Sequence, residues 1–152
     1  MTSFEALARV IIETGGRVSG LTADEIREIT LGQGLDRLPA RYEEYLRFLG
    51  GPKSFSLIAG IESYPYLVEL KDEARALLET EGHPELLPDT AVVIGIHGGY
   101  AVHWLTDAAL DDPPVQLYEE GDAGVAAEWP SFTACVEEHA RVAGLPWGSS
   151  PG

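Results

Sequence analysis

The chain has 152 residues, of which 45% are hydrophobic, and this length and composition predict one folded domain rather than a disordered chain. Its formal net charge of −15 argues against nucleic acid or an anionic membrane as a partner, because both select proteins with a basic surface. No apolar run approaches the roughly 18 residues that a membrane span needs. The first residues lack the basic and apolar leader of a secretory signal, and the single cysteine permits no internal disulfide. We therefore expect a cytoplasmic protein.

Three helices are predicted in the first third of the chain. Apolar residues at helical spacing indicate a helix over residues 3–14, and a capping box indicates a second over residues 22–31. Pro39 opens a third helix, since proline is tolerated at the first helical position, where its missing N–H had no intrahelical partner. Gly50 and Gly51 end that helix. Pro39 and the two glycines are therefore assigned structural roles.

The middle of the chain predicts a strand, a helix and then the central hairpin of the fold. The strand covers residues 54–58 and the helix covers residues 66–80. Two apolar runs, residues 92–96 and 100–105, follow and are joined by Gly98 and Gly99, which suit a tight two-residue turn. With that turn, residue 96 pairs with 101 and residue 94 with 103. Both faces of the hairpin are apolar, Trp104 included, so it belongs at the centre of the sheet.

In this register, His97 and His103 point to opposite faces of the hairpin and cannot share a metal ion. Cys135 lies in the apolar stripe of a helix, one turn before His139, and a packing role suits both residues. Glycine spacing typical of a phosphate loop, a serine nucleophile motif and a calcium loop are all missing from the sequence. We therefore expect a protein that is not an enzyme and holds no cofactor or metal. The distant alternative is a small hydrolase that uses the carboxylates near Glu119.

The last part of the chain adds one or two strands and a helix. Residues 115–118 predict a third strand, residues 120–122 a turn, and residues 125–129 either a fourth strand or a short bridge. Ser131 caps the final helix, whose inward positions are expected to be Phe132, Cys135, Val136, His139 and Val142. Taken together, the elements predict a single α+β domain over residues 1–143, with a mostly antiparallel sheet of about four strands flanked by about five helices. Residues 144–152 are predicted to form a flexible tail.

The acidic charge is unevenly distributed along the chain. Residues 76–140 carry 13 acidic side chains and no lysine or arginine, so this segment projects a negative field and suits a basic protein partner. The alternative interpretation is that the charge only keeps the protein soluble. The candidate partner-binding residues are acidic groups near the ends of the central strands, with one tyrosine as an aromatic anchor: Asp107, Asp111, Asp112, Tyr118, Glu119, Glu120 and Asp122.

The order of these motifs resembles the SUKH superfamily, which includes cell-wall-assembly-regulator-like proteins and bacterial toxin-immunity proteins. The similarity covers roughly residues 22–143 and rests on the following residues: Leu38, Pro39, Tyr42, Tyr45 and Leu46 of the third helix, Gly50 and Gly51, the hairpin of residues 93–105 with Asp107, residues 114–118, and Ser131 with Phe132. The resemblance implies an immunity protein that binds and neutralises a toxin domain, often a nuclease. A regulatory scaffold that recruits cellular proteins is the alternative.

Overall fold

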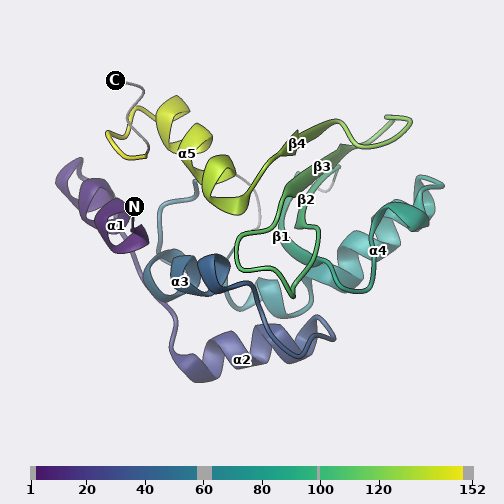
Figure 1. Ribbon diagram of the computed structural model, residues 1–152, viewed down its shortest axis with the longest axis horizontal. Helices are drawn as coiled ribbons and strands as arrows, with labels where there is room; N and C mark the ends of the chain where they lie inside the picture. Colours follow the sequence, from purple (N-terminus) through teal and green to yellow (C-terminus); the bar gives the residue numbers. More distant parts are fainter. Residues whose placement is uncertain (1–2, 58–62, 99, 149–152) are drawn as a thin grey trace.

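The structure, a computed structural model, describes residues 3–57, 63–98 and 100–148 and shows one α+β domain (Figure 1). Its elements within those ranges are α1 (Phe4–Glu13), α2 (Ala23–Gly32), α3 (Ala40–Leu49), the 3₁₀ helix η1 (Tyr66–Val68), α4 (Leu70–Thr80), the 3₁₀ helix η2 (Pro84–Leu86), β1 (Val92–His97), β2 (Ala101–Leu105), β3 (Val115–Glu119), β4 (Ala127–Trp129) and α5 (Phe132–Val142). The predicted fold class is confirmed. Among the described helices, none is long and apolar enough to cross a membrane.

The first three helices form where the sequence predicts them, because their ends are encoded locally. The Ser3 side chain accepts a hydrogen bond from an N–H of the first turn of α1, and Thr22 makes the predicted capping box with Glu25 at the start of α2. Pro39 differs from the prediction by one position, since it is the N-cap that precedes α3 rather than its first residue. At the other end of α3, a side chain added to Gly51 would collide with Ser19, so close packing selects glycine there.

The predicted strand over residues 54–58 is wrong for the residues that the structure describes, and Ile58 lies outside them. Residues 54–57 belong to no sheet. The Ser54 hydroxyl instead bonds the backbone of Ser19, at 2.7 Å to its carbonyl oxygen and 2.6 Å from its N–H. The predicted helix over residues 66–80 is interrupted, because η1 ends at Val68 and α4 begins at Leu70. At residues 54–57, hydrogen bonds between Ser54 and Ser19, 35 positions apart, are thus made in place of a strand ladder.

The central hairpin forms, but half of its predicted register is wrong. Val92 pairs with Leu105 as predicted. A bulge next to Gly95 then shifts the register by one residue, so that Gly95 pairs with His103 and Ile96 with Val102. The last pair is His97 with Ala101, which differs from the pairing that the two-residue turn predicted, and Gly99 lies outside the described residues. Gly98 has the predicted positive φ, at +60°.

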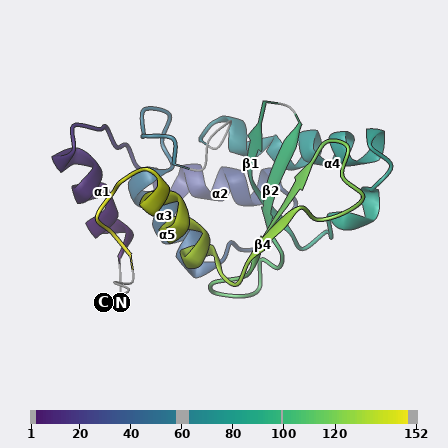
Figure 2. The same ribbon diagram turned by 90° about the horizontal axis from the view of Figure 1, so that it is seen from above.

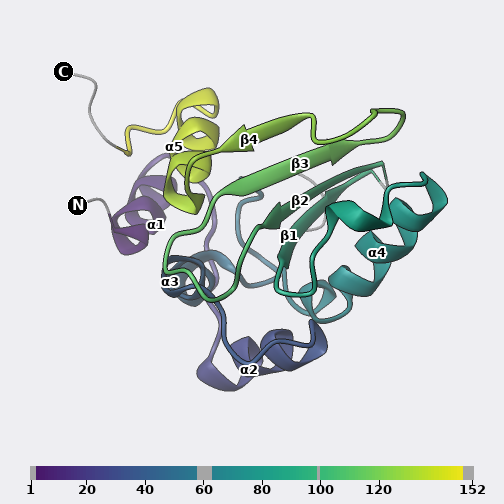
Figure 3. The same cartoon turned by 45° about the vertical axis from the view of Figure 1, so that its right-hand side comes forward.

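The sheet has the antiparallel order β1-β2-β3-β4, which settles residues 127–129 as a fourth strand. Its two faces are covered by different helices. Tyr118 on β3 bonds a residue at the end of α4, whereas the ring of His103, on the opposite face, makes an edge contact with the ring of His139 in α5. Figures 2 and 3 show α4 on one side of the sheet and α5 at the other. Trp104 on β2 is completely buried.

The C-terminal helix and the chain after it differ from the prediction at two points. Ser131 caps α5 and Phe132 packs in an aromatic cluster with Phe4, Tyr42 and Tyr45, but Val142 is 77% exposed. Ala140 is the last buried residue of α5 instead. The described part of the predicted flexible tail contacts the start of α1. Trp147 donates from its indole N–H to the Ser3 carbonyl at 2.9 Å, and its ring lies 5.5 Å from that of Phe4.

Candidate functional site

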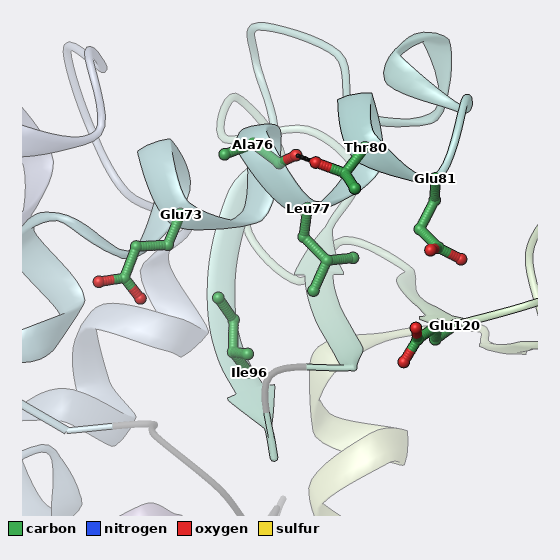
Figure 4. Close-up of a pocket in the computed structure, with 7 residues that line it drawn as sticks. All are labelled: Glu73, Ala76, Leu77, Thr80, Glu81, Ile96 and Glu120. Atoms are coloured by element: carbon green, nitrogen blue, oxygen red, sulfur yellow. Dashed lines mark hydrogen bonds between the residues drawn. The ribbon is translucent and has the colours of Figure 1, made fainter.

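A pocket of about 370 Å³ lies between α4 and the face of the sheet that this helix covers (Figure 4). Most of its lining comes from one stripe of α4, and one residue each comes from β1 and from the turn after β3. The lining residues are Glu73, Ala76, Leu77, Thr80, Glu81, Ile96 and Glu120. The α4 residues recur at intervals of three and four, which is the spacing that places them on one side of a helix.

The pocket is apolar in the middle and acidic at its two ends. Leu77 points from α4 towards Ile96, which forms the floor, with Glu73 on one side and Glu81 and Glu120 on the other (Figure 4). Eight residues separate Glu73 from Glu81, which corresponds to about 12 Å along a helix axis. The pocket therefore offers one carboxylate at one end and two at the other, separated by apolar surface.

The Glu81 carboxylate is held in place by two hydrogen bonds from the β3–β4 hairpin. It accepts one from the Tyr118 hydroxyl at 3.0 Å and one from the N–H of Gly121 at 2.8 Å. Gly121 has a φ of +91°, a left-handed conformation in which glycine is favoured over other residues. Burial, together with the Glu81 carboxylate, raises the pKa of the Tyr118 phenol. These contacts orient the carboxylate at the pocket edge before any ligand arrives.

Tyr118 cannot serve as the exposed aromatic anchor that the sequence predicted. Its side chain has 0% exposure and lies in the core beneath the hairpin. It lies close to the predicted partner-binding carboxylates in the sequence, but it points to the face of the sheet that α4 covers. Its role is to position Glu81, a residue 37 places earlier in the chain.

The structure separates the predicted acidic residues into two groups, at opposite ends of β3. Asp107, Asp111 and Asp112 precede the strand and make contacts within the fold. The Asp107 carboxylate accepts from the N–H of Ala109 at 2.9 Å, that of Asp111 lies 3.2 Å from the guanidinium of Arg37, and that of Asp112 accepts from the first turn of α5 at 3.0 Å. The three carboxylates of the first group therefore stabilise the loop before β3 and the start of α5.

The second group, Glu119, Glu120 and Asp122, lies at the other end of the strand. Glu119 is the last residue of β3, and Asp122 contributes its carbonyl oxygen to the Tyr118 hydroxyl at 3.3 Å. Glu120 alone among the seven predicted residues lines the pocket. Sequence reasoning missed Glu73 and Glu81. The available signal was their helical spacing on either side of Leu77.

Among the described residues, none of the three pocket carboxylates forms an ion pair. Both cations of α4 contact Asp89 instead: the guanidinium of Arg75 lies 3.5 Å from its carboxylate, and Lys71 donates to its carbonyl oxygen. Residues 76–140 supply no lysine or arginine. The negative charge at the pocket is therefore not neutralised within this part of the fold, and it is available to a cationic ligand.

His97 and His103 lie on the other face of the sheet from this pocket, whereas the ring of His83 lies 5.5 Å from that of Tyr118 on the α4 face. The bulge puts His97 and His103 on the same face, which corrects the predicted arrangement. His103 is buried between rings, 5.8 Å from Trp129 and 6.0 Å from His139, and its Nδ1 has no hydrogen-bond partner among the described residues. His139 Nδ1 lies 2.7 Å from the Cys135 carbonyl oxygen. Over residues 3–57, 63–98 and 100–148, no three His, Cys, Asp or Glu side chains gather in a way that could hold a metal ion.

Comparison with known proteins found no matching family model, no matching characterised sequence and no matching solved structure.

Proposed function

We propose that this chain is a non-enzymatic acidic binding protein that recognises a basic protein partner. Following the SUKH resemblance, the proposed partner is a toxin domain, often a nuclease, which this chain neutralises as an immunity protein. The observation that carries the proposal is the pocket on α4, where the carboxylates of Glu73, Glu81 and Glu120 surround an apolar floor and form no ion pair with described residues.

The physical basis of recognition is charge complementarity. A nuclease cleft carries basic side chains because it must hold phosphates, so an acidic surface competes for the same groups. The segment of residues 76–140, with 13 acidic side chains and no lysine or arginine, supplies that surface. Apolar contact at Leu77 and Ile96 adds the packing that distinguishes a specific partner from a general cation.

The experiment is a protection assay with a defined partner. The gene next to that of this chain is examined for a larger product ending in a basic domain, and that domain is expressed in cells with and without this chain. Protection of the cells, together with direct binding of the purified proteins, is the expected result. Binding without protection would favour the regulatory scaffold, and the absence of both would overturn the proposal.

A matched pair of variants shows whether protection depends on the pocket. Glu73→Gln with Glu120→Gln removes two pocket charges, whereas Glu119→Gln with Glu128→Gln removes two exposed charges outside it. Both double variants change the net charge by the same amount. The first should weaken protection and the second should preserve most of it.

A further inference from the structure

We propose that the pocket on α4 takes an extended segment of the partner with two basic residues four positions apart and an apolar residue midway between them. The inference rests on the proposed function, because this segment belongs to the basic partner proposed there. It adds the chemistry and spacing of the recognised sequence.

The spacing follows from the positions of the carboxylates. Glu73 lies at one end of the pocket and Glu81 with Glu120 at the other, and eight residues of helix rise by about 12 Å. In an extended chain, side chains at positions i, i+2 and i+4 share one face, and the outer two are about 13 Å apart. Two basic side chains on such a segment would therefore reach the two acidic ends together.

The apolar floor of the pocket determines which residue is expected at the central position of the partner segment. Leu77 and Ile96 lie between the acidic ends, so the side chain that arrives there meets apolar surface (Figure 4). An aliphatic residue would remove this surface from water, whereas a polar residue would lose hydrogen bonds to water without replacement.

The two ends differ in the cation that they favour. Glu81 and Glu120 lie together, and hydrogen bonds from Tyr118 and Gly121 hold the carboxylate of Glu81 in place. A planar guanidinium can donate several hydrogen bonds to paired carboxylates, whereas an ammonium acts as a point charge. The basic residue at this end should therefore be arginine.

The probe is the capped peptide Arg-Ser-Leu-Ser-Arg, titrated to millimolar concentration into the full chain labelled with ¹⁵N and followed by amide chemical shifts. Shift changes should be confined to α4, the end of β1 and the turn after β3. Replacing the central leucine by serine should weaken binding about five-fold, because less apolar surface is buried.

The decisive comparison is between two neighbouring residues. Glu120→Gln removes a carboxylate that lines the pocket, and Glu119→Gln removes an exposed carboxylate one residue away that does not. Glu120→Gln should lower the affinity for the peptide about three-fold, and Glu119→Gln should leave it nearly unchanged. Glu73→Gln tests the other acidic end with the same readout and should resemble Glu120→Gln.

Equal weakening by Glu119→Gln and Glu120→Gln, shifts elsewhere on the surface, or no binding at millimolar peptide would each overturn the inference. The protection assay separates this failure from that of the proposed function. If the chain protects cells but the peptide does not bind specifically at the pocket, the proposed function stands and the proposed peptide site is wrong. A chain that binds the peptide as expected but protects no cell would retain the pocket and lose the immunity role.

Discussion

Gln33 pairs with the backbone of Val93 as a neighbouring strand would. Its side-chain Nε2 donates to the Val93 carbonyl oxygen at 2.9 Å, and its Oε1 accepts from the Val93 N–H at 2.9 Å. Nε2 also donates to the Leu67 carbonyl oxygen at 3.0 Å. Because β1 is at the edge of the sheet formed by the described strands, these bonds satisfy backbone groups that no other described strand reaches. One buried amide therefore joins the end of α2, η1 and the sheet.

Replacing Gln33 by methionine should lower the free energy of unfolding by about 2–4 kcal/mol. The change keeps the length of the side chain but leaves the buried N–H of Val93 and two buried carbonyl oxygens without their partner. Urea unfolding of both proteins measures the difference. Gln116→Met is the matched control, since that amide bonds the exposed side chain of Glu128, and it should change stability by less than about 1 kcal/mol.

The features that sequence analysis predicted correctly are those encoded by neighbouring residues. Capping side chains at Thr22 and Ser131 mark helix starts because each bonds an N–H only a few positions later. The bulge in β1 had a local signal too, since glycine inside a strand often accompanies one, and Gly95 is that glycine. The predicted two-residue turn assumed a regular hairpin without this bulge, so the predicted pairing is wrong from Gly95 to Ala101.

Interactions between distant residues were not predictable in the same way. Gln33 and Val93 are 60 positions apart, and nothing near either residue in the sequence indicates that they pair. The pocket was only partly predicted for the same reason. Glu120 was identified from its acidic neighbourhood, whereas Glu73 and Glu81 join it only because α4 packs on the sheet.

Acidification should destabilise the protein through His103. Burial, with smaller contributions from His139 and His97, lowers the pKa of His103 from 6.5 to about 4. The unfolded chain then binds a proton at a pH where the folded chain does not. Stability is therefore retained above pH 6.5 and lost as the pH falls from about 6.5 towards about 4. Between pH 7 and pH 5, protonation of this one group in the unfolded chain should lower the free energy of unfolding by about 2 kcal/mol.

His103→Gln isolates this contribution, because His97, His139 and all carboxylates remain. Free energies of unfolding measured in urea at pH 7 and pH 5 give the loss for each protein. The variant should lose about 2 kcal/mol less than the wild type over this interval. An equal loss in both proteins would show that other groups cause the acid sensitivity.

The chain after α5 should contribute to stability, although its composition predicted a flexible tail. Trp147 packs against Phe4 and bonds the Ser3 carbonyl oxygen, so Trp147→Ala should lower the free energy of unfolding by about 1–3 kcal/mol. Val142→Ala, on the exposed side of α5, should change it by less than about 0.5 kcal/mol. Thermal and urea unfolding of the two variants measure both values. If Trp147→Ala leaves the free energy of unfolding unchanged, the segment after α5 does not contribute to stability.

Association with the proposed basic partner should depend on which end of β3 carries the altered charge. Glu120→Lys and Asp111→Lys each change the net charge by the same amount. Glu120 lines the pocket and forms no ion pair with described residues, whereas Asp111 already faces the guanidinium of Arg37 at 3.2 Å. Glu120→Lys should slow association about ten-fold at low salt, and Asp111→Lys about two-fold.

Salt distinguishes a local effect from a general one. Opposite charges accelerate the encounter of two proteins, and this acceleration is screened as the ionic strength rises. The association rate of the wild type, measured by stopped-flow mixing with the purified basic domain, should fall steeply between low and high salt. Glu120→Lys should flatten that dependence, because it removes attraction where the partner first makes contact, and Asp111→Lys should leave it nearly unchanged. If the two variants behave alike, the partner responds to the charge of the whole molecule, and the pocket does not guide its approach.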